Sequence, residues 1–249
     1  MCKLSGIVIT FNEEQKIVEC IRSLLLCCDE VIVVDSGSDD KTVELASDCG
    51  AKVFFNEWHG FGKQKNYALS LAKGEWILSL DADERITEEL SSQILNAIDS
   101  REYELFSFKR ITKAFGQWIK YSGWSNDVVV RLFKNGRFQF TDSLVHEKLN
   151  ILGHDVCLLN SPILHYRNDD LEGAIKRMDQ YSSLWASQNC ESKSGFVYLS
   201  LLKGVWVFFK IWIVKGGFLD GRAGFLIALT NAFGAIMKYS KLYLLKRNR

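Results

Sequence analysis

The chain has 249 residues, of which 47% are apolar and 24% charged, with a formal net charge of +1. This apolar content is enough for a sizeable core and excludes a disordered chain. The near-neutral charge argues against a nucleic-acid partner, because proteins that bind nucleic acid electrostatically usually carry a basic excess.

The cysteines and the amino-terminal residues predict a protein of the cytoplasm. The seven cysteines contain no Cys-x-x-Cys pair, and we expect them to be small buried apolar residues in a reducing compartment. Residues 1–4 lead directly into a strand-like run, which leaves no room for the charged and apolar regions of a secretory signal.

The first hundred residues alternate apolar, β-rich runs with segments of helical periodicity. The predicted strands cover residues 6–11, 30–35, 51–55 and 75–80. After the fourth strand, Thr87 is a plausible N-cap for a helix that continues with Leu90, Ile94 and Ile98 on one face. Strands that alternate with helices indicate a mostly parallel sheet covered on both faces.

Polar clusters follow three of these strands, at the carboxyl ends where such sheets bind ligands. Thr10, Asn12 and Glu13 follow the first strand, and Asp35 opens a turn after the second. Taken singly, each cluster is also what an ordinary solvated turn would contain. Neither a Gly-x-Gly-x-x-Gly motif nor a complete P-loop is present, which disfavours those two kinds of phosphate site.

The third cluster is Asp81 and Asp83, which follow an apolar run and are separated by one residue. The period of two along a strand would place both carboxylates on one side of the chain. Carboxylate oxygens suit Mg²⁺ or Mn²⁺, and these ions keep positions open for the phosphates of a nucleoside diphosphate. The pattern therefore predicts a divalent-metal site, with a solvated turn as the alternative.

Residues 101–168 have shorter, more β-like runs, which predict a mixed-sheet extension of the parallel sheet. The predicted strands cover residues 105–109, 128–133, 137–140 and 163–166. Asn135 and Gly136 form a hairpin signal between the second and third of these strands. The predicted fold class is thus α/β, with a Rossmann-like, mostly parallel sheet, a mixed-sheet extension and a helical carboxyl-terminal region.

The carboxyl-terminal region is apolar and basic. Residues 196–214 are almost wholly apolar, but Lys203 and Lys210 lie seven residues apart on one helical face. A spanning helix would bury both lysines, at a cost of about 2.5–3.5 kcal/mol each near the bilayer centre. We therefore expect a helix in the membrane interface, followed by a shorter apolar stretch and a basic end. The alternative is a helical hairpin that packs on the catalytic domain or forms an oligomer interface.

Three motifs in the first hundred residues resemble those of the family 2 glycosyltransferases of GT-A fold. They are IVITFNE at 7–13, VIVVDSGSDD at 31–40 and GEWILSLDADE at 74–84. Shorter motifs later in the chain resemble the bacterial lipopolysaccharide core β-1,4-glucosyltransferases. They are RLF at 131–133, VHE at 145–147, PILH at 162–165 and GFLDG at 217–221.

The resemblance implies an inverting, metal-dependent transferase that moves a hexose, glucose in this subgroup, from a UDP-sugar to a lipopolysaccharide inner-core sugar or a related glycolipid. It also implies a GT-A catalytic domain over 1–168, with a nucleotide-binding half at 1–100 and an acceptor half at 101–168. The helical region 169–249 would contact the inner face of the plasma membrane. The oligomeric state is not predicted.

The resemblance also implies roles for individual residues. Asp81 would contact the ribose edge, and Asp81, Asp83 and His165 would hold the metal. The alternative role for His165 is a hydrogen-bonded histidine at a strand end. The alternative role for Lys63 and Lys65 is that of solvated charges at a helix start. The other residues that would bind the nucleotide-sugar are Thr10, Asn12, Glu13, Asp35, Lys63, Lys65 and Asn66.

Inversion needs a base that takes the acceptor proton, and two carboxylates are candidates. The chain lacks the Glu-Asp motif usual in the family, which leaves Glu147 and Asp127. Glu147 is favoured because it follows a β-like segment and stands beside His146. Two other functions remain open at this point: a phosphohydrolase with Asp81 as nucleophile, and an inactive sugar-nucleotide binder that acts as a membrane scaffold.

Overall fold

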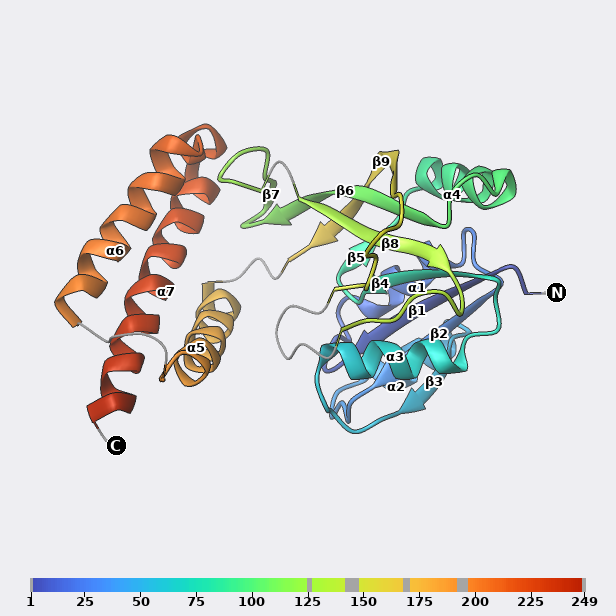
Figure 1. Cartoon of the computed structure of the whole chain (residues 1–249), viewed down its shortest axis with the longest axis horizontal. Helices are drawn as coiled ribbons and strands as arrows, with labels where there is room; N and C mark the ends of the chain where they lie inside the picture. Colours follow the sequence, from blue (N-terminus) through green and yellow to red (C-terminus); the bar gives the residue numbers. More distant parts are fainter. Residues whose placement is uncertain (1, 125–126, 142–147, 168–170, 192–196, 248–249) are drawn as a thin grey trace. The chain divides into compact units, whose positions relative to one another are not determined.

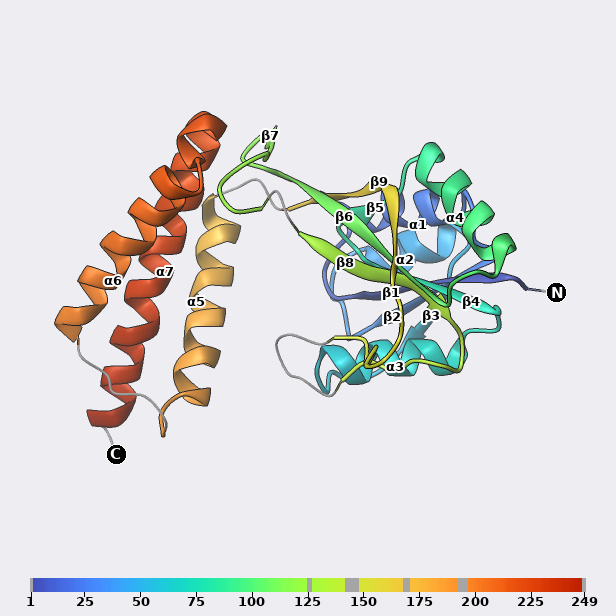
Figure 2. The same ribbon diagram turned by 45° about the horizontal axis from the view of Figure 1, so that its top comes forward.

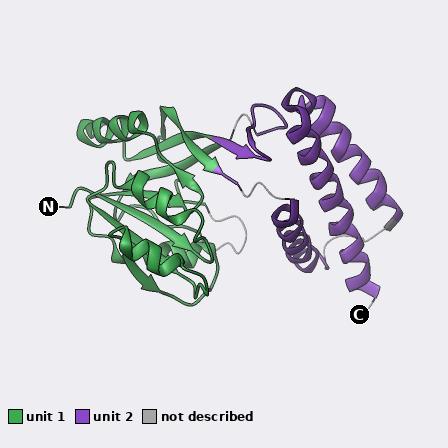
Figure 3. Ribbon diagram, turned by 180° about the vertical axis from the view of Figure 1, so that it is seen from behind, with its two compact units in different colours: residues 1–110, 127–165 green, residues 111–126, 166–249 purple. Residues whose placement is uncertain are grey.

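The computed structural model describes residues 2–124, 127–141, 148–167, 171–191 and 197–247. The chain divides into two compact units, coloured separately in Figure 3. Unit 1 comprises residues 1–110 and 127–165, and unit 2 comprises residues 111–126 and 166–249. Each unit is described by itself below.

Unit 1 is built on a mixed β-sheet. In the described part of the chain the sheet order is β3-β2-β1-β4-β8-β6-β9-β5, with β7 (Gln117–Trp118) also paired to β6. Strands β1, β2, β3 and β4 are parallel, whereas β8 is antiparallel to both β4 and β6. The predicted parallel sheet with a mixed extension is therefore confirmed. The strands are β1 (Leu4–Thr10), β2 (Glu30–Asp35), β3 (Lys52–Phe55), β4 (Trp76–Asp81), β5 (Glu84–Arg85), β6 (Leu105–Ala114), β8 (Val128–Lys134) and β9 (Cys157–Tyr166).

Helices cover both faces of this sheet (Figures 1 and 2). Apolar residues of α1 (Ile17–Leu24), α2 (Thr42–Asp48) and α4 (Glu88–Ser100) share one core with the sheet. On the other face, α3 (Phe61–Leu71) packs in a second core. All residues of β2 are buried, and between its two terminal carboxylates the strand is a continuous apolar run, residues 31–34. Thr87 caps α4 by accepting a hydrogen bond from the backbone N–H of Leu90, as predicted.

A buried carboxylate, Glu30, joins three segments at the amino-terminal ends of the strands. It accepts hydrogen bonds from the Ser5 hydroxyl, the Lys52 ammonium and the backbone N–H of Lys73. Burial by itself would raise the pKa of Glu30, but the hydrogen bonds from Lys52, Ser5 and Lys73 outweigh it and lower the pKa to about 2. Glu30 therefore stays charged in the folded protein at pH values where the unfolded chain takes up a proton.

We expect Glu30→Gln to reduce the acid sensitivity of unit 1. A carboxyl group whose pKa falls from 4.5 to about 2 on folding stabilises the protein fully above pH 4.5. That stability, about 2–3 kcal/mol, is lost as the pH falls from 4.5 toward 2. Urea unfolding at pH 7 and pH 3 measures the difference, which should be smaller in the variant. An unchanged difference would contradict the contribution assigned to Glu30.

The predicted hairpin after β8 is wrong. Residues 137–140 form no strand, and only Phe140 makes an isolated bridge, to Leu149. The Asn135 side chain instead donates to the backbone carbonyls of Ala72 and Gly74, which fixes the turn against β4. Phe138 and Phe140 then pack edge-to-face on Phe133 in the second core, and the backbone of residues 139–141 bonds to residues 148–150 instead of to β8.

Unit 2 contains three long helices, in which α7 packs against both α5 and α6 (Figure 1). Gly204 on α6 allows close approach, because a Cβ there would lie 2.6 Å from the Ile236 side chain of α7. In the described segments, no helix combines the length and the apolar character that crossing a membrane requires. The helices are α5 (Leu171–Gln188), α6 (Val197–Phe209), the π-helical turn η1 (Lys210–Val214), the 3-10 turn η2 (Gly217–Asp220) and α7 (Gly221–Arg247).

Candidate active site

Three predicted residues lie together at the carboxyl ends of the parallel strands. Strand β1 pairs with β2 so that Thr10 is opposite Asp35, and it pairs with β4 so that Ile9 is opposite Asp81. Thr10, Asp35 and Asp81 therefore occupy one edge of the sheet, as predicted. Thr10 is 5% exposed, and its hydroxyl has no hydrogen-bond partner among the described residues.

The loops after β1 and β2 are tied to each other. The backbone N–H of Asn12 donates to the Ser38 hydroxyl, and the Asn12 side chain accepts from the backbone N–H of Asp39. Asp35 is buried and accepts from the backbone N–H groups of Gly37 and Ser38. The Glu13 backbone N–H donates to the Thr42 hydroxyl. These contacts build the rim of the site.

Helix α3 places its three predicted residues in different surroundings. Lys63 is exposed. Lys65 is 2% exposed, and its ammonium lies 2.9 Å from Asp81 Oδ1. Asn66 exchanges two hydrogen bonds with the backbone of Phe140, at 2.8 and 2.9 Å. The structure thus brings Lys65 to the aspartate pair, whereas the Asn66 side chain holds the segment that follows β8.

Asp81 is bound by two cations. Lys65 donates to Oδ1, and the Arg131 guanidinium donates to Oδ2. Burial would raise the pKa of Asp81, but the charges of Arg131 and Lys65 outweigh it and hold the pKa well below its usual range. Asp81 is thus a carboxylate whose charge is already compensated by protein groups.

Behind Asp81 lies a chain of buried charges. Glu84 is fully buried and accepts from Arg131 at 2.7 Å and from Arg110 at 2.8 Å. Arg110 also donates twice to Asp127 Oδ2, at 2.6 and 2.8 Å. Burial would lower the pKa of Arg131, but Asp81 and Glu84 outweigh it and raise that pKa. With Lys65 the chain has three cations and three anions, so its charges balance without a ligand.

Arg131 reaches this position because of a β-bulge. Leu132 pairs with Phe106 and Val130 with Ser107, so Arg131 is the extra residue of β8 opposite β6. Bulges turn side chains away from the direction that regular pairing would give. The bulge therefore explains how a strand residue supplies a buried cation to both Asp81 and Glu84.

Asp83 has a different partner, His165. Strand β5 pairs with β9 so that Glu84 is opposite His165, which brings His165 Nε2 to 3.2 Å from Asp83 Oδ2. Burial would raise the pKa of Asp83, but the hydrogen bond and charge of His165 outweigh it and lower the pKa. Within the described ranges, no three His, Cys, Asp or Glu side chains surround a common point. Asp83 and His165 can offer a cation two ligands.

Of the two candidate bases, only Asp127 can be placed. Its side chain is 34% exposed, and Arg110 contacts one of its oxygens. Glu147 and His146 lie outside the described residues.

Sequence reasoning did not select Glu84, Arg110 or Arg131 as site residues. Glu84 directly follows the aspartate pair, and Arg131 opens the RLF motif, so both residues lie within motifs of the family resemblance. No sequence signal distinguishes Arg110 from the other basic residues near the end of its strand. Their pairing depends on the antiparallel extension of the sheet.

Comparison with known proteins identifies the family. Residues 5–160 match Glycosyl transferase family 2. An uncharacterized glycosyltransferase of Rickettsia felis is 30% identical, over 97% of this chain and 90% of the relative. The lipopolysaccharide core biosynthesis glycosyltransferase LpsC of Rhizobium meliloti is also 30% identical, over 96% of this chain and 92% of LpsC.

Solved structures agree on the fold. Residues 1–349 of S. aureus TarS, in complex with UDP-GlcNAc, superpose with a TM-score of 0.51 and 16% identity, covering 99% of this chain and 91% of that one. This likeness supports the predicted GT-A fold. The family match over residues 5–160, together with the relatives that span nearly the whole chain, shows that the protein belongs to glycosyl transferase family 2.

Proposed function

We propose that this glycosyltransferase moves a hexose, glucose in the first instance, from a UDP-sugar to an inner-core sugar of lipopolysaccharide or a related glycolipid, with inversion and with a divalent metal. The acceptor is suggested by LpsC, which is named for lipopolysaccharide core biosynthesis and is similar over 96% of the chain. The UDP donor is suggested by TarS, whose structure holds UDP-GlcNAc. The observation that carries the proposal is the Asp83–His165 pair beside the edge formed by Thr10, Asp35 and Asp81.

The metal would be held by Asp83 and His165. A carboxylate oxygen and an imidazole nitrogen are both suitable ligands for Mn²⁺, and the diphosphate would supply others. Asp81 already accepts from Lys65 and Arg131, so its negative charge is compensated, whereas the hydrogen-bond partner of the Asp83 side chain among the described residues is His165, at 3.2 Å. The metal, when bound, would neutralise the leaving diphosphate. In this proposal Asp81 contributes chiefly by orienting Lys65 and Arg131 and by contact with the ribose edge.

The nucleotide would lie along the strand ends. Thr10 offers a buried hydroxyl that has no partner among the described residues. Asn12, Glu13 and Asp35 shape the rim through the contacts described above and would hold uracil and ribose. Lys63, exposed on α3, would approach the phosphates, while Lys65 and Asn66 position the groups beneath them.

For the base we favour Glu147, with Asp127 as the alternative. Arg110 donates twice to one oxygen of Asp127, and the same guanidinium also binds Glu84, so Asp127 already serves the buried charge chain. A base must be free to take a proton from the acceptor hydroxyl. We expect the Glu147→Gln variant to keep its affinity for UDP and to lose sugar transfer. If only the Asp127→Asn variant behaves in this way, Asp127 is the base.

A glycolipid acceptor would place the enzyme at the membrane. We propose that the catalytic part, residues 1–168, works at the cytoplasmic face of the inner membrane and that residues 169–249 contact its surface. The apolar and basic character of α6 and α7 supports this arrangement.

The test is a UDP-release assay with UDP-glucose, UDP-galactose and UDP-N-acetylglucosamine, a lipopolysaccharide-core acceptor, and Mn²⁺ or chelator. We expect UDP release to be fastest with UDP-glucose. Chelator should remove at least about 90% of this rate, because the diphosphate then leaves without its cation. NMR of the product would show the inverted anomer. UDP binding without turnover of any donor would favour the inactive-scaffold alternative.

A further inference from the structure

The helices α6 and α7, with the turns η1 and η2 between them, form a hairpin with an exposed apolar face. Gly204 marks the side of α6 that packs on α7. Away from that side, Leu202 is 66% exposed, Val205 69% and Trp206 58%. On α7, exposed apolar residues recur every four positions, which aligns them in a row. The exposed apolar residues of the hairpin include Leu202, Val205, Trp206 and Phe209 of α6, Ile213, Val214, Phe218 and Leu219 of the turns, and Phe225, Leu229 and Phe233 of α7.

The hairpin also differs in charge from the rest of the chain. Residues 197–247 contain eight lysines and arginines and one acid, Asp220, whereas residues 1–196 contain 22 basic and 29 acidic residues. Asp220 is 5% exposed and accepts hydrogen bonds from the Ser122 hydroxyl and the backbone N–H groups of Lys120 and Tyr121. The described surface of the hairpin is therefore basic as well as apolar.

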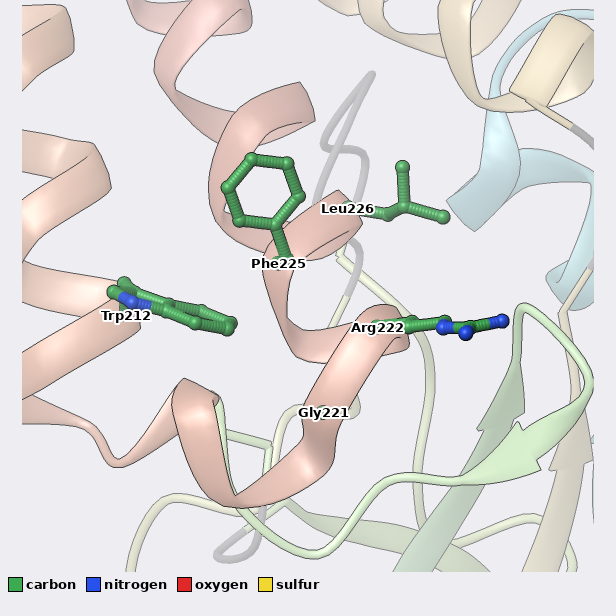
Figure 4. A pocket seen from close by; sticks show the side chains of 5 residues that line it. All are labelled: Trp212, Gly221, Arg222, Phe225 and Leu226. Atoms are coloured by element: carbon green, nitrogen blue, oxygen red, sulfur yellow. The ribbon is translucent and has the colours of Figure 1, made fainter.

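A pocket of about 500 Å³ lies at the turn of the hairpin. It is lined by Trp212, Gly221, Arg222, Phe225 and Leu226, shown in Figure 4. The Trp212 and Phe225 rings meet edge to face, with centroids 5.4 Å apart. Arg222 brings the only charged side chain of the pocket lining, and Lys210 and Lys215 are exposed on the adjoining turn. An apolar pocket beside a guanidinium suits an acyl chain of a lipid whose headgroup carries a phosphate.

We infer that the hairpin docks on an anionic phospholipid bilayer, and that the pocket takes an acyl chain of a phospholipid whose phosphate pairs with Arg222. The exposed apolar row enters the acyl boundary, and the cations Lys210, Lys215 and Arg222 meet the headgroups. The inference rests on the proposed membrane contact of residues 169–249, and it adds the lipid class, the docking residues and the pocket that takes an acyl chain.

A second copy of the chain fits the hairpin less well than a bilayer. Two such faces would bring together the exposed cations Lys210, Lys215 and Arg222 of both copies, whereas the one acid of each hairpin, Asp220, is buried. Like charges at this density repel each other, whereas an anionic bilayer attracts them.

The test is flotation of the full-length protein with vesicles of phosphatidylcholine alone or mixed with phosphatidylglycerol. We expect binding to the anionic vesicles that weakens with salt, and much weaker binding to the neutral ones. Arg222→Gln should lower the partition coefficient by about fivefold. Leu202→Ser should lower it by about tenfold. The matched controls Arg137→Gln and Leu152→Ser, exposed residues of unit 1, should change neither value.

Lipids with brominated acyl chains test the pocket itself. Bromine quenches nearby indole rings, so Trp212→Phe should remove part of the quenching, whereas Trp58→Phe in unit 1 should remove none. Equal quenching in Trp212→Phe and the parent protein would overturn the pocket assignment. Equal binding to neutral and anionic vesicles, no binding, or self-association that Leu202→Ser abolishes would overturn the docking surface.

Transfer to a soluble core oligosaccharide separates this inference from the proposed function. Transfer without vesicle binding would overturn the inference and the proposed membrane contact, and leave the proposed transfer activity standing. Anionic vesicle binding without transfer to any acceptor would support the inference and count against the function.

Discussion

The Asp83→Ala variant is expected to lose sugar transfer by a factor of at least about 100, as when an active site loses one group that stabilises developing charge. Within the part of the chain that the structure describes, Asp83 is the aspartate of the pair that no lysine or arginine side chain contacts directly, and His165 lies 3.2 Å from it. Its removal would take away the charge that holds a divalent cation on the diphosphate. UDP release with Mn²⁺ measures the loss, and calorimetry with UDP and Mn²⁺ should show weaker binding.

The fold should survive this substitution, because Asp83 is not part of the buried charge chain around Glu84. Circular dichroism and thermal unfolding would check this. Asp48→Ala is the matched control, since Asp48 is an exposed aspartate at the end of α2. Unchanged turnover in Asp83→Ala would exclude the proposed metal role, and equal losses in both variants would point to a nonspecific effect.

We expect Glu84→Gln to destabilise unit 1 by about 3 kcal/mol, because breaking a buried ion pair leaves a buried charge uncompensated. Glu84 is fully buried and serves two guanidiniums, Arg110 and Arg131, so its neutralisation leaves an excess of positive charge between Asp81 and Asp127. Urea unfolding at pH 7 measures the change in the free energy of unfolding. A loss of transfer should accompany it, since Arg131 also contacts Asp81.

Two comparisons make this prediction specific. Glu102→Gln, an exposed glutamate in the same unit, should change the free energy of unfolding by less than about 0.5 kcal/mol. The double variant Glu84→Gln with Arg110→Gln should lose less than the sum of the two single losses, because the residues share one interaction. Additive losses would show that Glu84 and Arg110 act independently.

The sequence was sufficient to predict the parallel half of the sheet. The runs that became β1, β2 and β4 are apolar on both faces, and such runs leave few alternatives to a buried strand. The turn-forming polar residues that follow them placed Thr10, Asp35 and Asp81 at one edge, which pairing in the structure confirms. Local pattern was enough because each feature is set by a few neighbouring residues.

The partners of the aspartates could not be predicted in the same way. Arg131 is 50 residues from Asp81 in the chain and 47 from Glu84, and its direction depends on a bulge that no local pattern marks. The Asn66 side chain holds the Phe140 backbone, a contact across 74 residues that no local pattern marks. The turn at Asn135 failed as a hairpin signal because the chain after it bonds to residues 148–150, and Phe138 and Phe140 pack on Phe133.

The bulge in β8 bears on how this chain tolerates insertions and deletions. Hydrogen bonding between β6 and β8 gives no reason for the extra residue, since Val130 and Leu132 already pair with consecutive residues of β6. Loss of the Arg131 codon would therefore leave a regular ladder available, while Asp81 and Glu84 lost a shared counter-ion. Length at this point in the strand is thus constrained by electrostatics rather than by the architecture of the sheet.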